Sequence, residues 1–135
     1  MTEPSVMRQR VPRRKWIALG VSLAIVVGGA ALYWHASRPL PFDPAVWLAG
    51  ELAKEDDPPR LRMADGLVET RALLGKSRAE VEAMLGSPTE TSKFRNYDLV
   101  YWLGPERGLM RIDSEWLALR LDSGARVATA EIVRD

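Results

Sequence analysis

The sequence predicts an α+β domain behind a single transmembrane helix: two N-terminal helices packed on a three-stranded antiparallel β-meander. Three observations predict this class. An uncharged run covers residues 16–34, apolar residues recur at helical spacing up to Pro88, and an alternation of period two follows it. Helices followed by a run of strands are typical of two-layer domains in which the helices cover one face of the sheet.

Composition limits the classes of function. The chain has 135 residues, enough for one domain, and 47% of them are hydrophobic, so it can bury a core. It has no cysteine, which excludes disulfides, thiol catalysis, cysteine–zinc sites and a lipid-modified cysteine. The net charge of +1 comes from basic residues concentrated in residues 1–15, and the rest of the chain is mildly acidic with no basic patch. This distribution argues against nucleic acid as a partner.

Residues 16–34 predict a membrane anchor. As a helix this run would span about 28 Å, close to the hydrocarbon core of about 30 Å. Trp16 at one end and Tyr33 with Trp34 at the other suit the two membrane–water interfaces. The positive-inside rule then places residues 1–15 in the cytoplasm and the C-terminal part outside it. The bilayer of the cytoplasmic membrane is therefore an expected partner of this segment.

Two questions stay open for this segment. It has the basic start and apolar run of a cleaved signal peptide, but it exceeds the usual run of about 7 to 15 residues and no A-x-A site follows, so an uncleaved anchor is favoured. Gly20, Ala24 and Gly28 form a stripe of small residues with a spacing of four. Such a stripe is typical of packing between membrane helices and would join two copies in a homodimer. The same spacing also arises in an anchor that is simply rich in small residues.

Residues 35–57 are expected to form a proline-punctuated linker with a short helix, in which Asp43 is the cap and Pro44 the first helical residue. The folded domain is expected over residues 58–135. Its first helix is predicted over residues 59–74, with Gly75 in the left-handed position that ends a helix.

The stretch LLGKSRAEVEAMLGSP, residues 73–88, predicts a short helix over residues 78–85. Ser77 is the N-cap, and Glu80 completes a capping box. Gly86 ends the helix, and the proline after it prevents continuation. The glycines do not have the order of a phosphate-binding loop, so the stretch is interpreted as structural.

Three strands are expected at residues 98–104, at about 115–122 and at about 126–133, with a hairpin turn at Asp122-Ser123-Gly124. Residues 89–96 carry a weaker strand pattern. The alternation places these residues on one face: Leu99, Tyr101, Leu103, Leu117, Leu119 and Leu121.

The other face of the sheet is expected to carry Val100, Trp102, Trp116 and Arg120. In the third strand, Val127 is expected to share a face with Thr129 and Glu131. Ala128, Ala130 and Ile132 would then lie on the opposite face.

The segment GKSRAEVEAMLGSP resembles the signature G-x-[ST]-x-x-[DE]-V-x-x-x-L-G-x-P of SmpA/OmlA (BamE-like) envelope domains. DLVYWLG and LALRLDSGARVATAEI are similar to the β-meander of that family. The resemblance covers roughly residues 58–133 and implies an αα-βββ fold in a small non-enzymatic protein of the bacterial envelope, whose best-known relatives help to assemble outer-membrane β-barrels. Those relatives are lipoproteins, whereas this chain lacks the cysteine and has the predicted anchor. Together, the two features predict a single-pass protein of the cytoplasmic membrane with a periplasmic or otherwise extracytoplasmic domain.

Two non-enzymatic functions are compatible with this fold. The favoured one is an interaction module that binds an envelope protein through an uncovered sheet face or an edge strand, in envelope or outer-membrane protein assembly. Trp102, Trp116 and Arg120 are the candidate contacts, since Trp and Arg are enriched in binding hot spots. The alternative is a small-molecule or peptidoglycan sensor with its ligand in the cleft between helices and sheet.

An enzyme is the less favoured function. Its acid/base group would come from Asp98, Glu106, Asp113 and Glu115. Acid/base catalysis by paired carboxylates needs a fixed separation and one raised pKa, and proximity in a loop supplies neither. We therefore predict no catalytic residue, no cofactor and no metal site.

The capping box gives a first testable prediction. Ser77→Ala removes the side-chain acceptor at the N-cap and should lower the free energy of unfolding by about 1 kcal/mol, measured by chemical denaturation. Loss of function in a variant that keeps its full stability would contradict the structural interpretation of this stretch.

Overall fold

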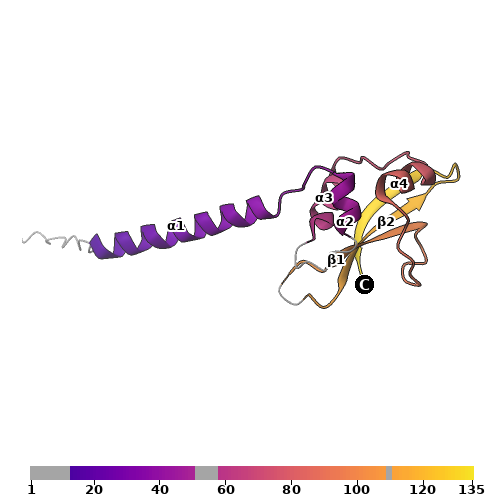
Figure 1. Ribbon diagram of the computed structural model, residues 1–135. Helices are drawn as coiled ribbons and strands as arrows, with labels where there is room; N and C mark the ends of the chain where they lie inside the picture. Colours follow the sequence, from indigo (N-terminus) through magenta and orange to yellow (C-terminus); the bar gives the residue numbers. More distant parts are fainter. Residues whose placement is uncertain (1–12, 51–57, 109–110) are drawn as a thin grey trace, which may run out of the picture. The chain divides into compact units, whose positions relative to one another are not determined.

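The computed structural model describes residues 13–50, 58–108 and 111–135, and the chain divides into two compact units, one up to Arg38 and one from Pro39 to Asp135 (Figure 1). The first unit contains helix α1 (Arg13–Ala36), in which the large apolar side chains that the structure describes, such as Ile25 and Leu32, are exposed. After its last residue, Ser37 Oγ donates a hydrogen bond of 2.8 Å to the carbonyl oxygen of Tyr33.

The prediction of a transmembrane helix over residues 16–34 is wrong. Within the described residues, no helix combines the length and the apolar character needed to cross a membrane. The run lacks charge, but Gly20, Ser22, Gly28 and Gly29 contribute little apolar surface to it. Freedom from charge is therefore a weaker signal than the summed apolar content of the helix.

The second unit confirms the α+β class and the three-stranded antiparallel sheet. Its strands lie in the order β1-β2-β3, which is a β-meander. In this described unit three helices, rather than two, precede the sheet, and they gather beside it (Figure 1). The elements are α2 (Pro44–Gly50), α3 (Pro59–Glu69), α4 (Arg78–Leu85), β1 (Leu99–Pro105), β2 (Ser114–Leu121) and β3 (Val127–Arg134).

The three helices and one face of the sheet share the main core. Its largest members include Trp47 of α2, Tyr101 of β1 and Leu117 of β2, each at most 1% exposed. The Trp47 indole Nε1 donates a hydrogen bond of 2.9 Å to the carbonyl oxygen of Leu85 at the end of α4. Arg60, also buried, donates from Nε to the Trp47 carbonyl oxygen at 2.6 Å. The short helix expected in the linker is thus an integral part of the core.

Helix α3 is shorter than the predicted span of 59–74. It ends at Glu69, and turns follow up to residue 75, with Arg71 at a φ of 55°. Gly75 does have a positive φ of 77°, but its amide donates to the carbonyl oxygen of Val127 at 2.9 Å. The amides of Arg71 and Ala72 donate to the carbonyl oxygens of Val68 and Leu67 at 3.1 and 3.0 Å, so a Schellman motif with Arg71 in the left-handed position ends the helix early.

Packing explains why a glycine, Gly66, stands inside helix α3. The amide of Leu40 donates to the Arg62 carbonyl oxygen at 2.9 Å, so the segment after Pro39 runs close against α3. A Cβ atom at position 66 would lie 2.9 Å from the carbonyl oxygen of Leu40. Glycine is therefore required for the close approach of these two backbones.

Helix α4 confirms the capping box and the predicted bounds. Ser77 Oγ accepts from the Glu80 amide at 3.3 Å, and Glu80 Oε2 accepts from the Ser77 amide at 2.7 Å. Gly86 ends the helix with a φ of 83°. The hydrogen bonds from Ser77 hold the pKa of Glu80 below its ordinary value.

The sheet confirms the predicted core face of β1 and β2, with Leu99 opposite Leu119 and Leu117 opposite Ile132. The expectation for Val127 is wrong. An irregularity in the β2–β3 register shifts the alternation, so Val127 packs in the core together with Ala130 and Ile132. The weaker strand pattern over residues 89–96 does not form a strand either.

Gly66→Ala tests the close approach to α3. The substitution gains about 1 kcal/mol of helix propensity but forces a contact that costs about 1 to 3 kcal/mol, so we expect a net loss of stability of about 1 kcal/mol in chemical denaturation. Glu69→Ala at the exposed end of α3 is the control and should change stability by less than about 0.5 kcal/mol. A Gly66→Ala variant more stable than the parent chain would contradict the argument.

Candidate binding site on the outer face of the sheet

The face of the sheet that points away from the helices, called here the outer face, carries an apolar cluster. Val100, Trp116 and Ala118 are buried there, although the helices lie on the other side. Trp102 and Val133 pack against this cluster and are partly buried. The outer face of a two-layer antiparallel sheet usually meets water and is polar, so this cluster requires its own cover.

Residues 87–98, called here the cover loop, supply that cover. Phe94 lies with its ring centroid 5.5 Å from that of Trp116 and 6.4 Å from that of Tyr97. Phe94 has a φ of 58°, which is uncommon for a bulky residue. The cover loop thus holds an aromatic side chain on the sheet through an unfavourable backbone conformation.

Polar contacts attach the cover loop to both sides of the sheet. The Thr89 amide donates to the Val100 carbonyl oxygen at 2.8 Å on β1. The Tyr97 hydroxyl donates to Glu131 Oε1 at 2.9 Å on β3. Lys93 forms an ion pair with Asp135. These contacts fix the loop across the outer face.

A groove of 440 Å³ lies along the cover loop. Its lining mixes apolar side chains, such as Phe94 and Val100, with charged ones, such as Lys93 and Arg95. This mixture suits a ligand that has both apolar and polar groups, as a peptide segment has.

The three predicted contact residues are all on the outer face, in different environments. Trp116 is only 8% exposed and is covered by Phe94. Trp102 is partly buried at the border of the cluster, and Arg120 is exposed, with its guanidinium 4.7 Å from the centroid of the Tyr97 ring. The face called uncovered in the sequence interpretation is therefore partly covered, and Trp102 and Arg120 are the accessible members of the set.

The four candidate carboxylates do not form one group. Asp98 lies at one end of β1, where its Oδ2 accepts from the Leu121 amide at 2.7 Å. Glu106, Asp113 and Glu115 lie at the opposite end, around the connection between β1 and β2. Asp113 is exposed, whereas Glu106 pairs with Arg134 at 2.6 Å. Within the described residues, no three His, Asp or Glu side chains come together to hold a metal ion.

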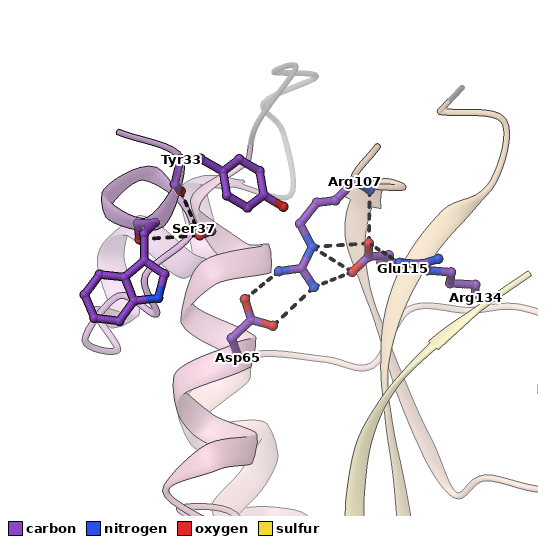
Figure 2. A network of polar contacts seen from close by, with 7 residues as sticks. Tyr33, Ser37, Asp65, Arg107, Glu115 and Arg134 are labelled. Carbon is purple, nitrogen blue, oxygen red and sulfur yellow. Dashed lines mark hydrogen bonds and ion pairs between the residues drawn. The ribbon is translucent and has the colours of Figure 1, made fainter. Parts of the chain in front are cut away.

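Glu115 is the buried member of the four and belongs to a network of ion pairs. Figure 2 shows Arg107 between Asp65 of α3 and Glu115 of β2, with Arg134 beside Glu115. Arg107 Nη2 lies 2.6 Å from Glu115 Oε2, and Arg107 Nη1 lies 2.5 Å from Asp65 Oδ2. Arg134 Nη2 lies 3.5 Å from Glu115 Oε1. The network thus joins a helix to two strands.

The surroundings keep Glu115 ionised. Burial alone would raise its pKa, but the hydrogen bonds from Arg107 and the charges of Arg107 and Arg134 outweigh burial and leave the pKa below its ordinary value. The same contact with Glu115 raises the pKa of Arg107. A carboxylate in this state is a poor general acid. The sequence interpretation treated Glu115 as a loop residue when it weighed the carboxylates. Alternation from Leu117 and Leu119, two and four residues farther along β2, is the signal that assigns Glu115 to the core face.

Gly20, Ala24 and Gly28 lie in α1, where their spacing places them on one face of the helix. A Cβ atom added at Gly20 or Gly28 would meet no atom within 4 Å. Homodimerisation through this stripe stays a prediction.

Comparison with models of protein families, with curated proteins and with solved structures found no match. The resemblance to SmpA/OmlA domains therefore stays a prediction from the sequence.

The ion network makes a pH-dependent prediction. Because the folded chain lowers the pKa of Glu115, its stabilising effect is present above the unfolded-state pKa of about 4.3 and is lost as the pH falls through the folded-state pKa. Glu115→Gln should therefore lower the free energy of unfolding by about 2 kcal/mol at pH 7, and the difference from the parent chain should shrink below about pH 4.

The matched control is Glu82→Gln, which makes the same change in the exposed pair of Arg78 and Glu82. It should cost less than about 0.5 kcal/mol at either pH. Equal effects of the two substitutions would contradict a special role for the buried carboxylate.

Proposed function

We propose that residues 39–135 are a non-catalytic protein-binding module whose binding surface is the outer face of the sheet together with the groove along the cover loop. The observation that carries this proposal is the apolar cluster of the outer face, with the aromatic side chains that pack against it, on a face that would otherwise be polar. Aromatic residues are enriched at protein interfaces, where they provide most of the binding energy.

Trp102 and Arg120 are the proposed anchors. Trp102 rests against the apolar cluster and is still partly exposed, so a partner can complete its burial without unfolding the domain. Arg120 is held near the Tyr97 ring, so less side-chain entropy is lost when it binds. The preorganised pair of Tyr97 and Arg120, beside the groove along the cover loop, is a suitable site for a peptide or loop of another protein.

The arrangement of the acidic residues supports a non-catalytic role. Glu106 and Glu115 both pair with Arg134, and Asp98 is bound to a backbone amide. These interactions use the carboxylates to hold the fold. Glu106 and Glu115 are not part of the groove lining, whereas Asp98 lines the groove while its Oδ2 is bound to the Leu121 amide.

The nature of the partner is also a proposal. The resemblance to SmpA/OmlA domains supports a protein of the cell envelope, in envelope or outer-membrane protein assembly. The ligand cleft of the alternative sensor function would lie between helices and sheet, where core side chains such as Trp47 and Tyr101 pack. We therefore favour a protein partner on the opposite face.

Site-specific photo-crosslinking tests the proposal. A photoreactive amino acid at position 95, in the groove, should give a discrete covalent adduct with one other protein in cells that produce the chain. The same amino acid at position 83, exposed on α4, is the control and should give none. Trp102→Ala should weaken the adduct strongly, because loss of a hot-spot residue costs about 2 kcal/mol, or about 30-fold in affinity.

Two results would contradict this function. One is a chain that gives no adduct at position 95, and the other is an adduct whose yield is the same with and without Trp102. The adduct itself identifies the partner by mass spectrometry.

A further inference from the structure

The two edges of the sheet differ in how their backbone groups are used. On β1, the outward Val100 carbonyl oxygen accepts from the Thr89 amide at 2.8 Å, and the Trp102 amide donates to Thr89 Oγ1 at 3.0 Å. The Trp102 carbonyl oxygen accepts from Arg60 Nη1 at 3.2 Å. The β1 edge is therefore closed by Thr89 and Arg60.

The β3 edge is closed only at its start. There the Val127 amide donates to the Lys76 carbonyl oxygen, and the Val127 carbonyl oxygen accepts from Gly75, both at 2.9 Å. Farther along β3, residues whose backbone groups bond to β2 alternate with residues whose backbone groups point away from β2. The Leu119 carbonyl oxygen accepts a hydrogen bond from the backbone amide of Asp98, which lies on the β1 side. The backbone amide and carbonyl groups of Leu119 therefore point toward β1 and away from β3.

Ala130 is the β3 residue opposite Leu119, and Ile132 is opposite Leu117. Since antiparallel pairs alternate, the amide and carbonyl groups of Ala130 and Ile132 point away from β2, toward the free side. Within the described residues, these groups have no hydrogen-bond partner. Their side chains are only partly buried although they face the core.

A hollow of 350 Å³ lies beside this open edge. Its walls are Val68 of α3, Arg71 and Leu74 of the following turn, and three residues at the start of β3. Leu74 is 40% exposed, and Arg71 is exposed and forms no ion pair with any described residue. The hollow thus offers an apolar wall and one unneutralised positive charge next to unpaired backbone groups.

We propose that the β3 edge binds an extended segment of another protein as a fourth strand of the sheet. The segment carries an apolar side chain that enters the hollow and a carboxylate that pairs with Arg71. Main-chain hydrogen bonds to Ala130 and Ile132 supply affinity, and the hollow with its arginine supplies specificity. This surface is separate from the outer face, so either proposal can fail without the other.

A second copy of the chain is less suited as the occupant. Glu131 is the only carboxylate of β3, and it points to the outer face, where it accepts from Tyr97. Arg71 lies on the helix side, beside Val68 of α3. A second β3 strand would therefore bring no carboxylate to Arg71.

The test uses a synthetic heptapeptide in which valine alternates with threonine and one valine is replaced by aspartate, so that the carboxylate lies on the same face as the remaining valines; its ends are acetylated and amidated. Its binding to the 135-residue chain is measured by fluorescence anisotropy. We expect saturable binding, no binding of a peptide N-methylated at every second amide, and slower hydrogen exchange at Ala130 and Ile132 in the complex.

Two variants make the outcome specific. Ala130→Pro removes an amide that does not contribute to the β2–β3 ladder and should weaken binding at least about 10-fold. Arg71→Glu reverses the charge at an exposed position and should also weaken binding about 10-fold. Arg78→Glu makes the same charge change on α4 and should leave binding unchanged.

The proposal is overturned if the parent chain does not bind the peptide, or if both Ala130→Pro and Arg71→Glu bind as the parent does. It is also overturned if sedimentation shows that the chain forms dimers which Ala130→Pro dissociates, because the edge is then occupied by a second copy. Trp102→Ala, which tests the outer face, should bind this peptide normally.

Discussion

The core between the sheet and the three helices is the constraint on which the rest of the domain depends. Leu117 and Leu119 of the central strand are fully buried, and α2, α3 and α4 all pack against that same face. Because the three helices all pack on one face of the sheet, they do not cover its other face, and its two edges carry backbone groups that only other segments can pair. The cover loop closes much of the outer face, Thr89 and Arg60 close the β1 edge, and most of the β3 edge is left open.

Polar groups hold this arrangement at its borders. Arg60 links α2, α3 and β1 from within the core, and Glu115 with Arg107 joins the end of the sheet to α3. Both are charged groups removed from water, which is tolerated because their hydrogen bonds are satisfied by several partners. The buried charges of the domain therefore stabilise its fold. The features available to a partner are the partly exposed aromatic side chains of the outer face, the groove along the cover loop and the unpaired backbone groups of β3.

Local signals predicted much of this fold. The capping box from Ser77 to Glu80 and the alternation of Leu99, Tyr101 and Leu103 are written in neighbouring residues, so the sequence alone was sufficient for α4 and β1. Helix α3 ends early because Arg71, rather than a glycine, takes the left-handed position, and residue type does not signal that. The shifted alternation at Val127 depends on the pairing of β3 with β2, which local patterns do not record.

The same distinction holds for the candidate site. The alternation of side chains along the strands placed Trp102, Trp116 and Arg120 on the outer face. The side chain that covers Trp116 comes from a loop, which has no periodic pattern. The predicted transmembrane helix failed for another reason, since the absence of charge was taken as a measure of apolar content.

The most direct test of the outer-face binding surface is the ¹⁹F NMR spectrum of the chain labelled with 5-fluorotryptophan, recorded with and without an extract of the cell envelope. Trp102 reports on the outer face and Trp47 on the core. The account predicts that the Trp102 resonance shifts or broadens on addition of the extract while that of Trp47 stays unchanged. A spectrum in which Trp102 is unaffected while other tryptophans respond would contradict it.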